Sequence, residues 1–392
     1  MTSMDTEKVI ELVKNADENC SCPHQHHHIP IEEIIVGSDA YDQLSHFLSQ
    51  KSYKKVLVIA DKNTYAAAGK NVVTRLEKLR VHYEVCLIEP NEIGDVVADE
   101  QALVQALLEI SDEIECLLAV GSGTIHDITR FCGAKTGKPF ISIPTAASVD
   151  GFTSLGAPLI IKGVKKTFPT ASPIALFADI GVLASAPKVM TAAGVGDMMA
   201  KFTSLADWKF GHLTHEEPYC PLAAEITRTA LEDCMAQVEQ IARGEEDGLR
   251  ILMNALIQSG LAMLMFGQSH PASGGEHHLS HYWEMEFLQQ KRRQVLHGAK
   301  VGVSTILLLS LYPKWFKEGK LHPKDLQNQA EIIEIIQSVP NPANLIRILE
   351  QLGGPTTPEQ LGIEPELVAR SLREAYQLRD RFTILKSFNT QG

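Results

Sequence analysis

The first half of the chain alternates short apolar runs with amphipathic segments. Helical spacing of apolar residues appears in YAAAGKNVVTRLEKLR and DEQALVQALLEISD. Around them stand four runs typical of buried parallel strands, KKVLVIAD, HYEVCLIEP, CLLAVGSGT and PFISIPTAAS. A later run, PIALFADIGVLASAP, predicts one more strand. Strand alternating with helix predicts a parallel sheet with helices on its faces.

The pattern changes after Pro187, where strand-like runs give way to long helical ones. Segments such as DGLRILMNALIQSGLAMLMFGQ and QVLHGAKVGVSTILLLSLY are apolar on most sides, as buried helices are. We therefore expect a Rossmann-like α/β dinucleotide-binding domain over residues 1–185, of which residues 1–30 are an N-terminal extension. Residues 186–392 are predicted to form an all-helical metal- and substrate-binding domain.

Charge and cysteine usage narrow the class of protein. The formal net charge is −12, which argues against nucleic acid or an anionic membrane surface as the main partner. The acidic N-terminal stretch lacks the apolar core of a signal peptide, and runs such as ILLLSLY are too short to span a bilayer. Seven scattered cysteines do not suggest a disulfide framework, so we expect a reducing cytoplasm.

Two loops follow predicted strands and carry small or polar residues. In AVGSGTIHD, Gly121 and Gly123 would let a pyrophosphate approach a helix N-terminus, although His126 replaces the third glycine of the dinucleotide motif. An ordinary strand-to-helix turn explains this stretch equally well. In SIPTAASVDGFTS, hydroxyls and the Asp150 carboxylate stand where ligands of open sheets bind, or simply form a polar loop. Asp61 ends an earlier strand, where an acid can accept from a ribose hydroxyl.

Three distant residues in the second half could form a metal site. His277 and His281 are four positions apart and would share one face of a helix. His297 lies in a separate apolar segment, where a lone histidine is more often a core residue. Asp197 follows two glycines, and its spacing alone favours a helix N-cap. Together, however, Asp197, His277 and His297 offer a carboxylate and two imidazoles with open coordination positions, as a catalytic metal requires.

The most conspicuous metal-binding motif is CSCPHQHHH, from Cys20 to His28. It holds two cysteines and four histidines, but it precedes the first strand and has no polar loop beside it for a substrate. We interpret it as a solvent-facing or loosely metal-binding segment rather than a catalytic site. Its removal is expected to leave the catalytic metal bound.

The stretches GSGTIHD, PTAASVDGFTS, GVGDMMAKF, SGGEHHLSH and LHGAKVG, in this order, resemble the iron-containing alcohol dehydrogenase, glycerol dehydrogenase and dehydroquinate synthase-like superfamily. Within it they look most like the glycerol-1-phosphate dehydrogenases, in particular the bacterial AraM-type branch. The match runs from about Ile34 to beyond Lys300, and PTAASVDGFTS and SGGEHHLSH are its specific pieces.

The resemblance implies a role for each of these stretches. Asp197, His277 and His297 would hold one divalent ion, Ni²⁺ or Zn²⁺, while Asp150, Asp197 and His281 would contact the substrate. Asp197 and His281 would thereby also be the catalytic residues. NAD(H) or NADP(H) would be bound by Asp61, whose carboxylate slightly favours NAD(H), and by residues of both strand-end loops. The loop residues are Gly121, Gly123, Thr124, Ile125, His126, Asp127, Thr145, Ala146, Ala147, Ser148 and Ser154.

The activity implied is reversible reduction of dihydroxyacetone phosphate to sn-glycerol 1-phosphate by a homo-oligomer, with a dimer favoured, for phospholipid or ether-lipid precursors. Alternatives are a glycerol or polyol dehydrogenase, a dehydroquinate-synthase-like lyase, and a nickel or zinc storage or chaperone protein that uses CSCPHQHHH. The substrate phosphate needs cations, but Lys162, Lys165 and Lys166 are interpreted as a solvated basic hairpin.

Overall fold

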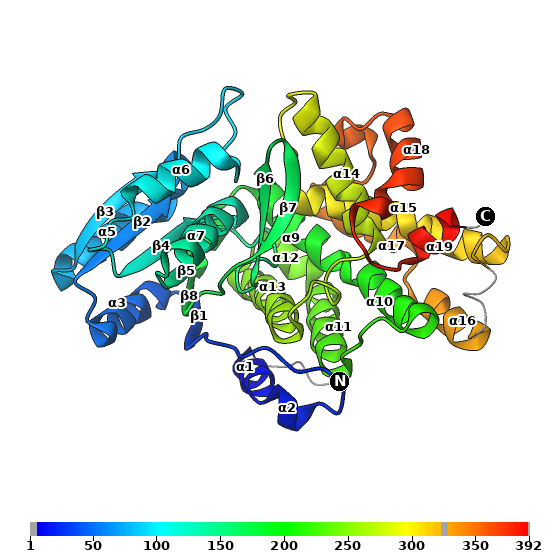
Figure 1. Cartoon of the computed structure of the whole chain (residues 1–392), viewed down its shortest axis with the longest axis horizontal. Coiled ribbons are helices and arrows are strands. Elements are labelled where there is room, and N and C mark those ends of the chain that lie inside the picture. Colours follow the sequence, from blue (N-terminus) through cyan, green and yellow to red (C-terminus); the bar gives the residue numbers. More distant parts are fainter. Residues whose placement is uncertain (1–5, 323–327, 391–392) are drawn as a thin grey trace.

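A six-stranded parallel sheet forms the first half of the protein in the computed structural model, which describes residues 6–322 and 328–390 (Figure 1). Its strands follow the order β1 (Glu33–Gly37), β8 (Ala175–Asp179), β5 (Phe140–Pro144), β4 (Cys116–Gly121), β2 (Lys55–Ala60) and β3 (His82–Leu87). Every residue of β4 and β5 is buried, as the continuous apolar runs predicted. The predicted parallel sheet is confirmed, and the expected extra strand is β8, inserted between β1 and β5.

Helices cover both faces of this sheet because successive strand residues point to opposite sides. Val56 and Leu118 pack on one face with α3 (Ala40–Lys51) and α5 (Lys70–Leu79). Leu57 and Leu117, their sequence neighbours, pack on the other face with α6 (Glu100–Glu109) and α7 (Gly123–Thr136). The short α4 (Lys62–Thr64) and the π-helical turn η1 (Tyr65–Gly69) lead from β2 into α5.

A two-stranded antiparallel hairpin, β6 (Gly156–Ile161) and β7 (Val164–Pro169), stands apart from the main sheet. Figure 1 shows it between the sheet and the helices of the second half. The hairpin expected around Lys162 is therefore present, and its position brings it to the boundary between the two halves.

The second half is helical throughout its described residues. It begins with α8 (Ile180–Ser185) and α9 (Lys188–Met199), directly after β8. The helices that follow are α10 (Lys201–His215), α11 (Pro221–Ala236), α12 (Val238–Arg243), α13 (Glu246–Phe266), α14 (Gly275–Gln289), α15 (His297–Lys317), α16 (Gln329–Ser338), α17 (Pro342–Gln351), η3 (Glu359–Leu361), α18 (Pro365–Glu374), η4 (Ala375–Leu378) and α19 (Ile384–Asn389).

Helix α13 is the central helix of this half. Among the described residues it is the one helix long and apolar enough to cross a membrane, with a mean hydropathy of 1.5 in its most apolar window. That window is 78% buried inside the protein, where it packs against α11 and its neighbours. Its apolar character is therefore that of a core helix.

The N-terminal extension packs against the helical half. It contains α1 (Thr6–Lys14) and α2 (Ala16–Asn19), and Val9, Val13 and Ile29 lie in the same apolar core as α11 and α13 (Figure 1). Residues 6–30 therefore pack against helices that follow them by about two hundred positions in the sequence.

Helices α9 and α15 approach each other without side chains between them. The carbonyl oxygen of Gly298 lies against Gly196, and that of Ala193 lies against Gly298, so a Cβ at either glycine would overlap backbone. Asp197 is inside α9, near its C-terminal end. The interpretation of Asp197 as a helix N-cap is therefore wrong, because the helix begins nine residues earlier, at Lys188.

We predict that Gly298→Ala lowers the free energy of unfolding by about 2 kcal/mol or more, because the added methyl group forces α9 and α15 apart. Urea denaturation measures it. Gly151→Ala is the control, since a Cβ there meets no atom within 4 Å. Equal stability of the two variants would show that the close approach is not needed.

Candidate active site and metal centre

A cavity of about 800 Å³ lies where the carboxyl ends of the strands meet the helical half. It is the place where open α/β sheets bind ligands. One wall carries the glycine loop and α7, a second carries the hairpin β6–β7, and α14 with the start of α15 forms the third.

Asp197, His277 and His297 converge beside this cavity from α9, α14 and α15. One carboxylate oxygen and two ring nitrogens lie within 4.8 Å of one another, and the two imidazole centroids are 5.2 Å apart. The buried Nδ1 of His297 has no hydrogen-bond partner among the described residues. An unpartnered ring nitrogen beside a carboxylate and a second imidazole fits a divalent cation.

Burial prepares both histidines as ligands. It lowers the pKa of His277 and of His297 well below the usual range, so both rings are neutral at pH 7. Nδ1 of His277 lies 2.8 Å from Oε1 of the buried Glu276, which leaves Nε2 for a metal. A carboxylate behind a ligand histidine fixes the ring and its tautomer, as in many metal sites.

Lys201 joins Asp197 to the loop that carries Asp150. Its ammonium lies 3.0 Å from Asp197 Oδ1 and 2.7 Å from Asp150 Oδ2, and its side chain is fully buried. The Asp150 amide donates to Asp197 Oδ2 at 3.0 Å, while Ser259 donates to Asp150 at 2.9 Å. Burial and the Asp150 charge raise the pKa of Asp197, and Lys201 opposes that rise. Each Asp197 oxygen keeps a lone pair for an ion.

The predicted dinucleotide residues divide into two groups. Those that line the cavity are Asp61, Gly123, Thr124, Asp127, Ser148 and Ser154, together with the predicted substrate residue Asp150. Those outside the lining are Gly121, Ile125, His126, Thr145, Ala146 and Ala147. The cofactor-binding role of the second group was assigned by motif position and stays a prediction.

His126 belongs to this second group. Its ring contacts the Ser122 carbonyl at 2.9 Å and the Ser142 hydroxyl at 2.7 Å, so it ties α7 to β5. Burial lowers its pKa to about 3. A neutral histidine therefore takes the position where the dinucleotide motif has a glycine for close helix–strand packing.

Two other lining residues already have partners within the protein. Oδ1 of Asp61 accepts from the amides of Asn63 and Thr64, which caps α4, so Oδ2 is the oxygen left for a ligand. The Ser154 hydroxyl is 2.7 Å from the buried Arg130 guanidinium, which also holds the Gly151 and Gly156 carbonyls. Arg130 thus shapes the loop after β5.

His281 lies one turn beyond His277 on α14 and lines the same cavity. Its ring centroid is 6.1 Å from that of His277 and 5.9 Å from that of His297. Nη2 of Arg379 donates to its Nδ1 at 3.2 Å, and burial lowers its pKa well below the usual range. A neutral ring whose Nδ1 accepts carries its proton on Nε2.

The cavity lining also contains four cations that were not predicted as site residues: Lys165, Arg293, Lys300 and Arg379. Lys165, from the hairpin, and Lys300, from α15, both pair with Glu284, at 2.8 Å and 3.0 Å. Around Glu284, therefore, two lysines share a single carboxylate. The hairpin is therefore not simply solvated: Lys165 is half-buried in the cavity wall, whereas Lys162 and Lys166 are exposed. The basic residues of the hairpin were a signal in the sequence, but Glu284, the partner of Lys165, lies 119 residues further along the chain.

The fold, together with the cluster of Asp197, His277 and His297, indicates the general class of enzyme. The chain has the architecture of the iron-containing alcohol and glycerol dehydrogenases, and residues 35–187 match the family described as iron-containing alcohol dehydrogenase. Glycerol dehydrogenase from Schizosaccharomyces pombe superposes with a TM-score of 0.67 at 19% identity, over 91% of this chain and 85% of that one. NADH-dependent butanol dehydrogenase A from Thermotoga maritima gives 0.66 at 16% identity, over 93% and 94%.

Closer relatives narrow the assignment. A glycerol-1-phosphate dehydrogenase from Geobacillus stearothermophilus, named as using NAD(P)+, is 52% identical over 97% of this chain and 98% of its own. Enzymes of the same name from Bacillus subtilis and Pyrococcus furiosus are 43% and 32% identical, over 92% and 90% of this chain and 92% of theirs. The chain belongs to the glycerol-1-phosphate dehydrogenase family.

We predict that Glu276→Gln weakens Ni²⁺ binding about tenfold or more, because a neutral amide holds the His277 ring less firmly than a carboxylate. Competition with a chromophoric chelator gives the dissociation constant. Glu286→Gln, on the same helix but paired with Arg370 at the surface, is the matched control. An unchanged constant in Glu276→Gln would contradict the supporting role of this carboxylate.

Proposed function

We propose that this protein catalyses the reversible, NAD(P)H-linked reduction of dihydroxyacetone phosphate to sn-glycerol 1-phosphate. The observation that carries the proposal is one cavity with three features: the adjoining cluster of Asp197, His277 and His297, a glycine-loop helix N-terminus, and the cations Lys165 and Arg379 in its lining. Relatives named for this activity cover nearly the whole chain at up to 52% identity.

The first feature serves the ketone. Asp197, His277 and His297 would hold Ni²⁺ or Zn²⁺, which would polarise the substrate carbonyl as a Lewis acid. Lys201 and Ser259 both contact Oδ2 of Asp150, so its other carboxylate oxygen can accept from a substrate hydroxyl. The same network orients Asp197, because the Asp150 amide holds its second oxygen.

The second feature serves the dinucleotide, which supplies the hydride when bound. Gly123 and Thr124 begin α7, whose free amides favour a pyrophosphate. Asp61 Oδ2 can accept from the adenosine ribose, and a 2′-phosphate beside this carboxylate is disfavoured. NADH is therefore the preferred form.

His281 is the proton-handling residue. Its proton sits on Nε2, because Arg379 occupies Nδ1, and the ring faces the same cavity as the metal ligands. It can donate a hydrogen bond from Nε2 to the oxygen of the reduced substrate, while solvent supplies the proton that this oxygen takes up.

The cations bind the substrate phosphate. Lys165 and Arg379 reach the cavity from the hairpin and from the segment after η4, and Glu284 pairs with both Lys165 and Lys300. A phosphorylated substrate gains charge-assisted hydrogen bonds that a plain polyol cannot make. This feature favours dihydroxyacetone phosphate over dihydroxyacetone.

The remaining expectations stay predictions: a homo-oligomer, a reducing cytoplasmic location and use of the product in phospholipid or ether-lipid precursors. The seven cysteines are all free thiols, which fits such a compartment.

The test is a reduction assay with dihydroxyacetone phosphate, NADH or NADPH and added Ni²⁺ or Zn²⁺, followed by stereochemical analysis of the product. We expect sn-glycerol 1-phosphate, with NADH used more efficiently. Preference for unphosphorylated dihydroxyacetone would instead indicate a polyol dehydrogenase. Product formation without net NADH consumption would indicate a lyase.

Lys165→Met should raise KM for dihydroxyacetone phosphate about tenfold or more and change turnover of dihydroxyacetone little, because it removes a phosphate partner and not a reacting group. Steady-state kinetics on both substrates measure the split. Lys166→Met, the exposed neighbour on β7, is the control and keeps both constants. Equal losses on the two substrates would contradict phosphate binding by Lys165.

A further inference from the structure

The segment from Cys20 to His28 is anchored to the helical half. The amide of His27 donates to the Met265 carbonyl at 2.8 Å, and the His24 ring stands edge-on to Phe266 at 5.6 Å. The side chain of His26 is buried, and Cys20 and Cys22 are partly buried. The interpretation as a solvent-facing segment is therefore wrong for these three residues, because α11 and α13 cover them.

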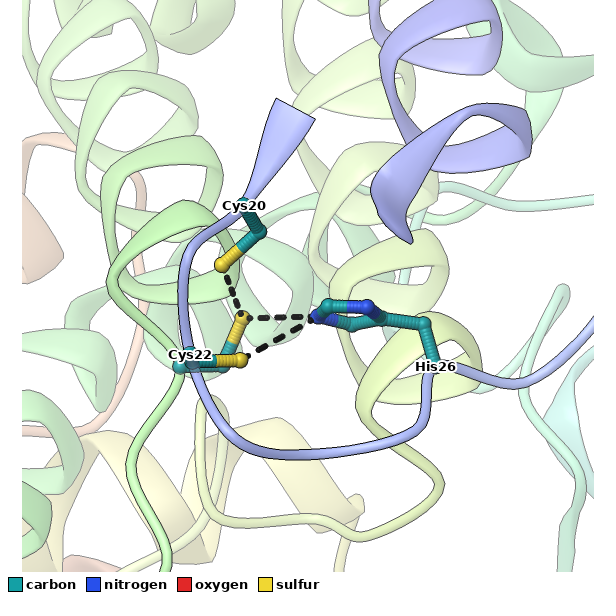
Figure 2. Close-up of side chains that lie close together, drawn as sticks. Cys20, Cys22 and His26 are labelled. Carbon is teal, nitrogen blue, oxygen red and sulfur yellow. Dashed lines mark hydrogen bonds between the residues drawn. The ribbon is translucent and has the colours of Figure 1, made fainter. Parts of the chain in front are cut away.

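A fourth ligand reaches this segment from far along the chain. Cys220 caps the start of α11, and its Sγ lies 3.6 Å from Sγ of Cys20 and 3.5 Å from Nε2 of His26. The Sγ of Cys22 is 3.4 Å from the same His26 nitrogen. Figure 2 shows Cys20, Cys22 and His26 turned toward one another from a single loop. The four ligand atoms all lie within 4.8 Å of each other.

These separations match the edges of a zinc tetrahedron. Zinc binds thiolate sulfur at about 2.3 Å and imidazole nitrogen at about 2.0 Å. Tetrahedral angles then place two sulfurs about 3.8 Å apart and a sulfur and a nitrogen about 3.5 Å apart. The measured separations of 3.6, 3.5 and 3.4 Å need only small shifts to enclose an ion.

The surroundings support a metal as well. Nδ1 of His26 lies 2.7 Å from Oδ1 of Asp17 on α2, so Nε2 is the nitrogen left for coordination. A carboxylate behind a ligand histidine is the same arrangement as Glu276 behind His277. It also gives a reason for the position of α2, which has little apolar surface to hold it.

We propose that Cys20, Cys22, His26 and Cys220 form a second metal site, which holds a structural Zn²⁺ and fastens the N-terminal arm to α11. Three thiolates and one imidazole are the ligands of closed structural zinc sites, and they select zinc over the oxygen-preferring ions. The site has four protein ligands, so no position remains for a substrate. It is separate from Asp197, His277 and His297, and does not depend on the proposed function.

The N-terminal segment that the proposed zinc site would hold also reaches the active-site cavity. His27 and Gly267, where the arm meets the end of α13, are both lining residues. A Cβ at Gly267 would overlap the His27 ring, so the arm lies directly on this turn. Zinc that fixes Cys22 and His26 therefore fixes the adjoining rim of the cavity.

The experiment measures zinc per chain by elemental mass spectrometry in tag-free, full-length protein. In a His277→Ala/His297→Ala background, which removes two ligands of the catalytic cluster, we expect about one zinc per chain to remain. Adding Cys22→Ser or Cys220→Ser should remove it, leaving less than about 0.2 per chain. His28→Ala, an exposed histidine two residues from a ligand, is the matched control and keeps the ion.

Cobalt substitution reports the ligands directly. Co²⁺ in this site should show thiolate-to-metal charge-transfer absorption in the near ultraviolet and intense tetrahedral bands in the visible, lost in Cys22→Ser and kept in His28→Ala. Protein in the His277→Ala/His297→Ala background that contains no zinc and gives no such spectrum would overturn the proposal. So would zinc content unaffected by Cys22→Ser, or a Cys20–Cys220 disulfide found by mass spectrometry of protein purified without reductant.

Discussion

The close approach of α9 and α15 is the constraint on which the active site depends. Asp197 and His297 are a hundred positions apart, and they meet because Gly196 and Gly298 let two helix backbones touch. His297 is the first residue of α15, so any separation of these helices moves one of the three candidate metal ligands. His277 joins them from α14, where Glu276 fixes its ring. Close packing at these two glycines therefore positions the side chains of Asp197 and His297.

Around this contact the protein buries several charges that balance one another. Lys201 has no exposed surface and lies between the carboxylates of Asp150 and Asp197. Removal of one member of such a group strands its partners in a medium of low polarity and costs about 3–5 kcal/mol. Glu284 is shared in the same way by Lys165 and Lys300. These networks join the loop after β5, the hairpin and the helical half, so they fix the two halves about one cavity.

Much of this could be predicted from the sequence, and the failures have physical reasons. Buried strands are continuous apolar runs, so the parallel sheet was predictable. Asp197, His277 and His297 could be grouped as candidate metal ligands because their stretches are distinctive, and the structure brings their side chains together. Local spacing wrongly predicted Asp197 as a helix N-cap, because the residue at which a helix begins also depends on the elements packed against it. The loop motif assigned His126 to the cofactor site, but its contacts with Ser122 and Ser142 could not be read from the motif. Cys220 and Glu284 could not be found, because a single residue shows no partner two hundred or a hundred positions away.

We therefore assign the proposed catalytic ion to inconspicuous residues and the proposed structural ion to the conspicuous motif. Anomalous diffraction at the metal absorption edges, from crystals of full-length protein, tests this assignment most directly. It predicts two peaks: one bonded at about 2.0–2.2 Å to Asp197, His277 and His297, and a zinc peak at about 2.3 Å from three cysteine sulfurs. A single peak at the cysteines, with none at Asp197, would contradict it.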